Sequence, residues 1–464
     1  MHKTPGPHAH PAAVGRIPIA VARNAACLLG FCLLGFFAAL YLSAPQLYFR
    51  LVSFFFFFDV PHDSPFDDLL AVMTSIECWQ KGLHSYNGGG GGCVGFNYSP
   101  IWLRLGFMAK GTVPVPLAAL ALASAFLISM RYLPLQRTKR GLALMVLAGA
   151  SSTSVFAIER ANVDVLLYLF CFAGAACLSL HWPRRVWGYA LFALAGFLKF
   201  YPIVLMGLAL RERLPRALAI FSLLALAALA FYLAYHEEMR PVLGGVSSLN
   251  THWGPFSDRF AARQLPDGIW LLMGNDAPPT AAALLPGTDS VNPKPPFWAV
   301  PTLTLMAVIA AFWQWRRADF RRSWDALTPR EADFLLVGAI VVAGCFFAGY
   351  NIMYRAIFLL LALPGLIAMA AAAPNAFWRW LPLAVVYNLW APTIQHLIQY
   401  AAKLTGSLYA GRLVITADWF GHELAWWWTM AAFIAVMLQL AATAPALGFL
   451  RAARGRNSAA PQAR

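Results

Sequence analysis

The sequence predicts an all-α polytopic integral membrane protein with about ten full transmembrane helices and one re-entrant helical hairpin, in total about 11 to 12 segments. Hydrophobic residues make up 60% of the 464 residues and charged residues only 12%, and the mean hydropathy is +0.61. Many apolar runs are long enough to cross a hydrocarbon core of about 30 Å. The net charge of +15 comes from Lys and Arg clustered between these runs, which is typical of cytoplasmic loops and disfavours nucleic-acid binding.

The apolar windows give the expected spans in chain order. The second of them is expected to break near Gly111, and short helices are expected in the loops between spans. The spans are predicted at about 24–46, 98–130, 141–157, 162–181, 215–235, 297–315, 333–350, 354–373, 378–396 and 424–449.

The basic clusters predict the orientation of these spans. They all fall on one side if both termini are cytoplasmic. We therefore expect a disordered cytoplasmic tail at 1–23, one membrane domain at 24–450 and a second cytoplasmic tail at 451–464. Outer loops are expected at about 47–97, 236–296 and 397–423. The expected location is the plasma membrane, which is the inner membrane of a bacterium, with the active site on the periplasmic side.

The segment 186–210 does not fit a single crossing, because arginines flank it on both sides. Two half-helices that meet at the sequence LKFYP would keep both ends cytoplasmic. Pro202 favours this interpretation, since a proline disfavours helical backbone at the residue before it, here Tyr201. We expect a re-entrant hairpin with Lys199 at its tip.

Two adjacent aspartates, Asp67 and Asp68, follow the first span in the stretch SPFDDLL. Ser64, Pro65 and Asp67 have the order of an N-cap, a first-turn proline and a capping-box acid. Asp67 would then have a local structural role and leave Asp68 free. Alternatively, both carboxylates only stabilise a helix N-terminus, by about 0.3–1 kcal/mol each.

Other polar residues lie at the predicted outer ends of later spans. Any one of them can simply lie in a solvated turn, with Lys and Arg extending to lipid headgroups. Several cations and a carboxylate at one membrane face would instead suit a phosphate-bearing lipid and a base for a hydroxyl nucleophile. These residues are Glu159, Arg160, Asn162, Asp164, Lys199, Asn351, Tyr354 and Arg355.

Two of the seven cysteines, Cys78 and Cys93, share the first outer loop. A disulfide between them is possible if that loop faces an oxidising compartment. No Cys/His spacing typical of a metal site is present, so no metal or other cofactor is expected.

The order of several motifs resembles a known family. Asp68 is followed by Gly82 and Tyr86, then by NYSPIWL, ERANVDVLLYLF and LKFYP with a basic loop after it. This order is similar to that of the polyprenol-phosphate-mannose-dependent mannosyltransferases of the GT-C superfamily, glycosyltransferase family 87, formerly described as a domain of unknown function. The resemblance covers about residues 24–235 by motif.

The resemblance implies a GT-C-like fold and roles for individual residues. Asp68 matches the catalytic aspartate of the family, which acts as general base, with Asp67 as the alternate. Lys199 matches the lysine of a K-x-x-P element and Asn162 a turn asparagine, while Tyr98 lies in a Y-x-P motif. From the chemistry we add Arg160, Arg355 and Tyr201 to Lys199 as candidates for binding the donor phosphate.

Three departures from the family pattern bear on these roles. Asp67 stands beside Asp68, so the identity of the base is open. Glu159, Arg160 and Ala161 replace a common glycine and glutamine, and NGGGGGCVGF is inserted before Tyr98.

The expected function is the inverting transfer of one sugar, by resemblance mannose, from a polyprenyl-phosphate donor to an acceptor hydroxyl at the outer face. The lipid-linked sugar is a substrate and not a cofactor, and the acceptor is a glycolipid, polysaccharide or protein. Two alternatives are a secondary transporter, which also uses broken helices and intramembrane charges, and a lipid-linked oligosaccharide ligase. The lack of an internal repeat disfavours the transporter.

Overall fold

The part of the chain that the structure describes folds into helices joined by loops and contains no β-strand, as the sequence predicts. The structure, a computed structural model, describes residues 17–56, 65–83, 86, 93, 96, 98–136, 138–245, 256–258, 298–349, 351–404 and 408–448. The helices of the first half are α1 (Ile19–Ser43), α2 (Pro45–Phe56), α3 (Asp67–Gln80), the 3₁₀ helices η1 (Trp102–Arg104) and η2 (Gly106–Met108), α4 (Val115–Met130), α5 (Lys139–Gly149), α6 (Ser152–Glu159), α7 (Val163–Leu178), α8 (Trp182–Lys199), η3 (Tyr201–Arg211) and α9 (Leu214–Gly245). The second half contains α11 (Ala299–Arg316), α12 (Ala318–Asp325), α13 (Pro329–Ala348), η6 (Met353–Phe358), α14 (Leu359–Ala372), α15 (Ala376–Leu404), α16 (Leu408–Thr443) and η7 (Pro445–Leu447).

Six segments of the described chain are long and apolar enough to cross a membrane, as expected of a polytopic membrane protein. They are Ile19–Ser43, Lys139–Glu159, Leu214–Val242, Pro329–Ala348, Met353–Ala372 and Phe420–Thr443. Shorter apolar helices occupy Val115–Met130, Val163–Leu178 and Tyr201–Arg211. The expected second span is shorter than predicted, because residues 102–108 form two 3₁₀ turns and the regular helix begins only at Val115.

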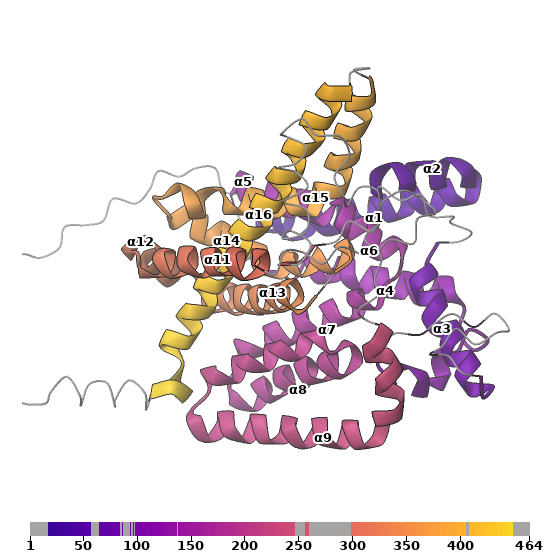
Figure 1. The fold of residues 1–464 in the computed structure, drawn as a ribbon, viewed down its shortest axis with the longest axis horizontal. Helices are drawn as coiled ribbons and strands as arrows, with labels where there is room; N and C mark the ends of the chain where they lie inside the picture. Colours follow the sequence, from indigo (N-terminus) through magenta and orange to yellow (C-terminus); the bar gives the residue numbers. More distant parts are fainter. Residues whose placement is uncertain are drawn as a thin grey trace, which may run out of the picture.

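Several boundaries differ from the expected ones. The first helix begins at Ile19, within the range expected to be a disordered tail, and residues 1–16 lie outside the described part. The range 397–423, expected as an outer loop, is helical wherever it is described, because α15 continues to Leu404 and α16 begins at Leu408. These ends of α15 and α16 project together from the rest of the molecule (Figure 1). Most of the expected loop 236–296 lies outside the described residues.

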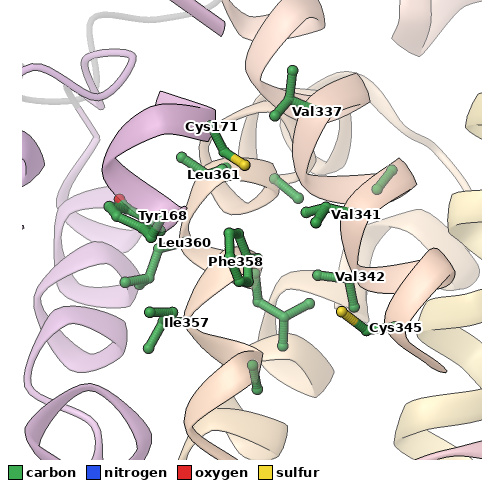
Figure 2. Packing of buried hydrophobic residues seen from close by; sticks show 14 of the residues in the cluster. Tyr168, Cys171, Val337, Val341, Val342, Cys345, Ile357, Phe358, Leu360 and Leu361 are labelled. Atoms are coloured by element: carbon green, nitrogen blue, oxygen red, sulfur yellow. The ribbon is translucent and has the colours of Figure 1, made fainter. Parts of the chain in front are cut away.

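The core lies where α13 packs against α7 and α14. Almost the whole circumference of α13 is buried, so its sequence is apolar without the polar stripe of a surface helix. Phe358, at the end of η6, lies between side chains of α7 and α13, with Tyr168 on one side and Val342 on the other (Figure 2). This packing fixes the position of the η6 segment relative to the start of α7.

The segment expected to form the re-entrant hairpin folds into α8 and η3, which turn back on each other at Phe200. The two arms are in close contact, since a Cβ on Gly196 would lie 3.0 Å from the Cα of Ile203. At the open end, Arg185 forms an ion pair of 3.3 Å with Glu212, so both ends lie on the same side. The 18 residues of α8 span about 27 Å, so this arm is longer than the half-helix expected.

The basic loops gather at the end of the bundle that holds the open end of this hairpin. Arg211 pairs with Asp333 near the start of α13. Arg330 donates to the carbonyl of Tyr132 at 2.6 Å. The helices α7, α13 and α14 connect this end to the opposite one, where the hairpin tip and η6 lie (Figure 1). The basic loops that the structure describes therefore share one end of the bundle.

Candidate functional site

The candidate site lies at the other end of the bundle, where four separate segments meet. They are the start of α3, the turn between α6 and α7, the tip of the hairpin and η6. The backbone N–H of Phe66 donates to the carbonyl of Glu159 at 2.9 Å, which joins the start of α3 to the end of α6. Segments that are up to about 290 residues apart therefore contribute side chains to one small volume.

Unusual backbone conformations are concentrated at this site. Among the described residues, the three non-glycine residues with a positive φ are Phe66 (69°), Ala161 (46°) and Phe200 (55°). Each is adjacent to residues that the sequence singles out: Asp67, Arg160, Asn162, Lys199 and Tyr201. Such conformations cost about 1–3 kcal/mol each and persist only where the surroundings impose them, most often at functional sites.

The two aspartates at the start of α3 are both held by Arg160. Asp68 Oδ1 accepts from Arg160 Nη2 at 2.7 Å and from its Nε at 3.1 Å, and Asp68 Oδ2 accepts from Asn162 Nδ2 at 2.5 Å. Asp67 Oδ2 lies 3.2 Å from Arg160 Nη1. The side chain of Asp68 is 19% exposed and that of Asp67 is 30% exposed, so both carboxylates are accessible from the surface of the protein. Asp68 is the more firmly oriented of the two.

The predicted capping box at this helix is wrong. The helix begins at Asp67, its N-cap is Phe66 in a left-handed conformation, and this cap makes no side-chain hydrogen bond. Pro65 precedes the helix and is not in its first turn, and Ser64 lies outside the described residues. Asp67 is therefore the first residue of the helix and not the third after an N-cap, and its carboxylate contacts Arg160.

Asp164 organises the second half of the site. Its side chain is fully buried and forms ion pairs with Lys199 Nζ at 2.8 Å and with Arg355 Nε at 3.3 Å. Tyr201 Oη also donates to its carboxylate, at 3.0 Å. Asn162, the N-cap of α7, accepts from the N–H of Asp164 at 2.8 Å, which fixes its backbone. One carboxylate therefore faces two cations, and this half of the site has an excess of positive charge.

Aromatic rings pack against the two cations, Lys199 and Arg355. Lys199 Nζ lies 4.8 Å from the centre of the Tyr98 ring, and the guanidinium of Arg355 lies 5.3 Å from that of Tyr201. Both are within the range of a cation–π contact. Burial raises the pKa of Tyr98 well above its ordinary value, so its hydroxyl keeps its proton. Arg355 also donates to Asn351 at 2.8 Å, which connects the site to the later part of the chain.

All eight predicted site residues lie in this region. Asp67, Asp68, Arg160 and Asn162 form the acidic half, Lys199, Tyr201 and Arg355 the cationic half, and Tyr98 packs against Lys199. The sequence places Asp164 in the set of polar residues at the outer ends of the spans but assigns it no role in the site. Its signal in the sequence is a carboxylate in the first turn of an otherwise apolar helix, two residues after an N-cap asparagine.

No group of three or more His, Cys, Asp or Glu side chains in the described part of the chain is arranged to hold a metal ion. Comparisons of the chain with models of protein families, with curated proteins and with solved structures find no match.

Proposed function

We propose that this protein is a membrane glycosyltransferase that moves one sugar, mannose by resemblance, from a polyprenyl-phosphate donor to an acceptor hydroxyl with inversion at the anomeric carbon. The proposal rests mainly on the juxtaposition of two partly exposed carboxylates with an adjacent excess of cationic charge. A hydroxyl nucleophile needs a base within hydrogen-bond reach. A lipid phosphate needs cations that stabilise the charge it carries as it leaves.

In the proposed reaction, Asp68 accepts the proton of the acceptor hydroxyl while that oxygen forms a bond to the anomeric carbon. The bond between the anomeric carbon and the phosphate oxygen breaks, and its electron pair stays on the leaving polyprenyl phosphate. Lys199 and Arg355 stabilise that phosphate, since their combined charge exceeds that of Asp164. Arg160 and Asn162 orient Asp68 and act as positioning residues.

The location of this site favours the outer face of the membrane. The basic loops gather at the opposite end of the bundle, and cytoplasmic loops are the ones enriched in Lys and Arg. Lipid-linked sugar phosphates then reach the site from the outer leaflet. The plasma membrane, with both termini in the cytoplasm, is the location that we propose.

The proposal is tested with the purified full-length protein in lipid nanodiscs. Polyprenyl-phosphate mannose that carries a radiolabel in the sugar is incubated with a membrane and glycan extract as the acceptor source. We expect the label to move to a product that resists mild acid, which cleaves the donor. If the donor stays intact with every extract, while proteoliposomes take up a solute without bond formation, the protein is a transporter and the proposal fails.

A further inference from the structure

An apolar cavity of about 450 Å³ lies beside the acidic half of the site. Residues of α1, α2, α4 and α6 line it, and its size falls within the range of ligand pockets. The walls are almost wholly aliphatic or aromatic and include Leu34, Phe37, Leu127, Val155 and Ile158. Its end is formed by Pro65, Phe66 and Glu159, which directly adjoin Asp67 and Arg160 in the chain.

The cavity opens towards the surroundings of the helix bundle. Leu42 of α1 and Leu120 of α4 both line it and are among the exposed large hydrophobic residues. Most of α1 faces outward, and α1 is one of the helices long enough to cross a membrane. An opening between these two helices therefore leads into the hydrocarbon region, so a chain can enter from the bilayer.

A buried carboxyl group marks the polar end of this cavity. Glu159 is only 6% exposed, and its Oε1 accepts a hydrogen bond of 3.4 Å from the hydroxyl of Tyr48. Its Oε2 is buried and accepts from none of the described residues. A buried polar atom normally has a partner, so the cavity offers an acceptor to a ligand with a hydroxyl group.

The charges at this end disfavour a phosphate. Among the described residues, three carboxyl groups, those of Glu159, Asp67 and Asp68, surround the guanidinium of Arg160. The excess of positive charge lies instead around Asp164, between Lys199 and Arg355. A lipid with a hydroxyl head fits the cavity, whereas a phosphate head fits the other half of the site.

We propose that this cavity holds the hydrocarbon chain of the acceptor, so that the acceptor is a lipid whose hydroxyl-bearing head reaches the two aspartates. The role of this lipid as the acceptor rests on the proposed transferase function, whereas its binding to the cavity can be measured without any sugar transfer. The donor, with its phosphate, then occupies the cationic half of the site.

The test uses two diazirine-bearing probes on the full-length protein in nanodiscs: a long-chain alkyl mannoside and a polyprenyl phosphate. We expect the alkyl mannoside to label cavity residues, as mapped by mass spectrometry. Ala38 lines the cavity on α1, whereas the neighbouring Ala39 is also exposed but does not line it. Ala38→Trp should lower the labelling about tenfold, since the ring fills the space of the chain, and Ala39→Trp should leave it unchanged.

A second pair of variants, on the opposite wall of the cavity, keeps the test decisive if Ala38→Trp fails to fold. Leu120→Trp fills the cavity from α4, and Leu117→Trp is its control, because Leu117 is exposed on the same helix and outside the lining. The same contrast in labelling is expected in this pair.

Three outcomes overturn the inference: labelling of the cavity by polyprenyl phosphate at an equal or greater yield, labelling by the mannoside that neither filling variant lowers, or no labelling of the cavity. Sugar transfer combined with any of these leaves the proposed function intact. Labelling of the cavity by the mannoside without any sugar transfer would instead support the lipid site and contradict the proposed function.

Discussion

Asp164 and Lys199 form an ion pair of 2.8 Å between the first turn of α7 and the last turn of α8, and both side chains are more than nine-tenths buried. Arg355, from η6, approaches the same carboxylate at 3.3 Å. Asp164 therefore connects the consecutive helices α7 and α8 to η6, which lies about 190 residues later in the sequence. A buried charge is tolerated only when it is paired, so these three residues depend on one another.

Replacement of Asp164 by Asn should destabilise the protein strongly. It would leave two buried cations without their common counter-ion, and breaking a buried pair costs about 3–5 kcal/mol. Lys199→Met should cost less, because Arg355 still pairs with Asp164. The double variant Asp164→Asn/Lys199→Met should recover part of the loss, since it removes one of the two cations that have lost their common counter-ion.

Denaturation of the detergent-solubilised variants, followed by tryptophan fluorescence, measures these differences. Asp333→Asn is a suitable comparison for the stability of Asp164→Asn. It also removes a buried carboxylate that pairs with an arginine, Arg211, but it does so at the other end of the bundle. If Asp164→Asn is as stable as the unchanged protein, Asp164 is not the common counter-ion of the two cations.

The hairpin shows which features the sequence can predict. Pro202 and the flanking arginines are signals that the sequence carries locally. They correctly predicted a break after Lys199 and two arms whose open ends lie close together, where Arg185 pairs with Glu212. The length of α8 was not predictable in this way. The extra length lies at its start, because α8 begins at Trp182, before Arg184 and Arg185, whereas the charge pattern predicted that the first arm begins after these arginines.

The start of α3 and the role of Asp164 show why the rest could not be predicted. The capping signature at Ser64 and Asp67 is local, whereas the helix start is set by the hydrogen bond from Phe66 to Glu159, a contact across 93 residues of sequence. Asp164 acquires its role only when the hairpin tip and η6 converge on it. Periodicity and composition carry no information about such meetings of distant segments.

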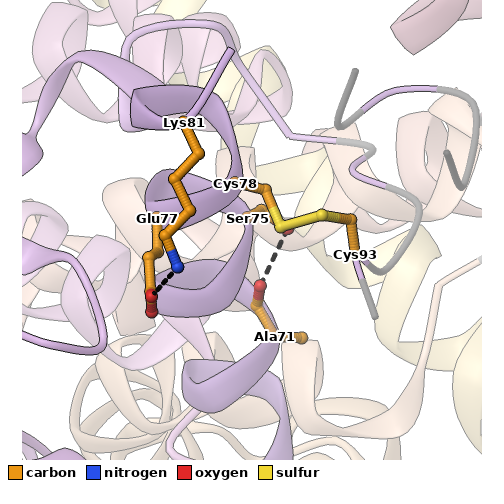
Figure 3. The surroundings of a disulfide bond; sticks show 6 residues. All are labelled: Ala71, Ser75, Glu77, Cys78, Lys81 and Cys93. Atoms are coloured by element: carbon orange, nitrogen blue, oxygen red, sulfur yellow. Dashed lines mark hydrogen bonds and ion pairs between the residues drawn. A yellow bond between two sulfur atoms is a disulfide. The ribbon is translucent and has the colours of Figure 1, made fainter. Parts of the chain in front are cut away.

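The disulfide between Cys78 and Cys93 should be formed in the native protein, and it joins the end of α3 to the following segment (Figure 3). In cells, the protein should gain two additional maleimide–polyethylene glycol adducts after reduction. The other five cysteines react under denaturing conditions both before and after reduction; they are Cys27, Cys32, Cys171, Cys177 and Cys345. Disulfides persist in oxidising compartments, so two adducts gained only on reduction would place this loop outside the cytoplasm.

Removal of this disulfide should also lower stability. The two cysteines are 15 residues apart, for which the chain-entropy model gives about 3 kcal/mol. Cys78→Ala/Cys93→Ala should therefore unfold at lower denaturant concentration, and reductant should have this effect on the unchanged protein but not on the double variant. Equal sensitivity of both proteins to reductant would assign the loss to another cause.

Gly82 should tolerate substitution poorly for a structural reason, although it belongs to the motif that resembles the family. It follows the end of α3 with a φ of 73°. Its N–H donates to Trp79 and that of Leu83 to Cys78, each at 3.0 Å, which is the pattern of a Schellman C-cap.

Gly82→Ala should cost about 1 kcal/mol from the left-handed conformation alone, since no atom lies within 4 Å of the added Cβ. Gly82→Asn should cost less, because asparagine tolerates this conformation better. Denaturation curves of both variants measure the costs. A loss of sugar transfer by Gly82→Ala at unchanged stability would show that the glycine contributes directly to the site.

Asp68→Asn should abolish most of the proposed sugar transfer, whereas Asp67→Asn should reduce it only modestly. Loss of a general base lowers the rate by about 10²–10⁴-fold. Asp68 is the candidate because both its oxygens are held, by Arg160 and by Asn162, so its orientation is fixed. Asp67 lies 3.2 Å from one nitrogen of Arg160 and has the more exposed side chain of the two, 30% against 19%, so its loss should affect mainly the position of Arg160.

Glu77→Gln is the matched control for both variants. Glu77 is an acid on the same helix, and it pairs with Lys81 one turn later at 2.5 Å (Figure 3). An exposed i,i+4 pair contributes only about 0.3–0.5 kcal/mol, so Glu77→Gln should transfer sugar at nearly the normal rate. The measurement is the initial rate with saturating polyprenyl-phosphate mannose. If Asp67→Asn shows the large loss and Asp68→Asn does not, the base is Asp67. The hydrogen bonds between Asp68 and Arg160 then serve to position Arg160 beside Asp67.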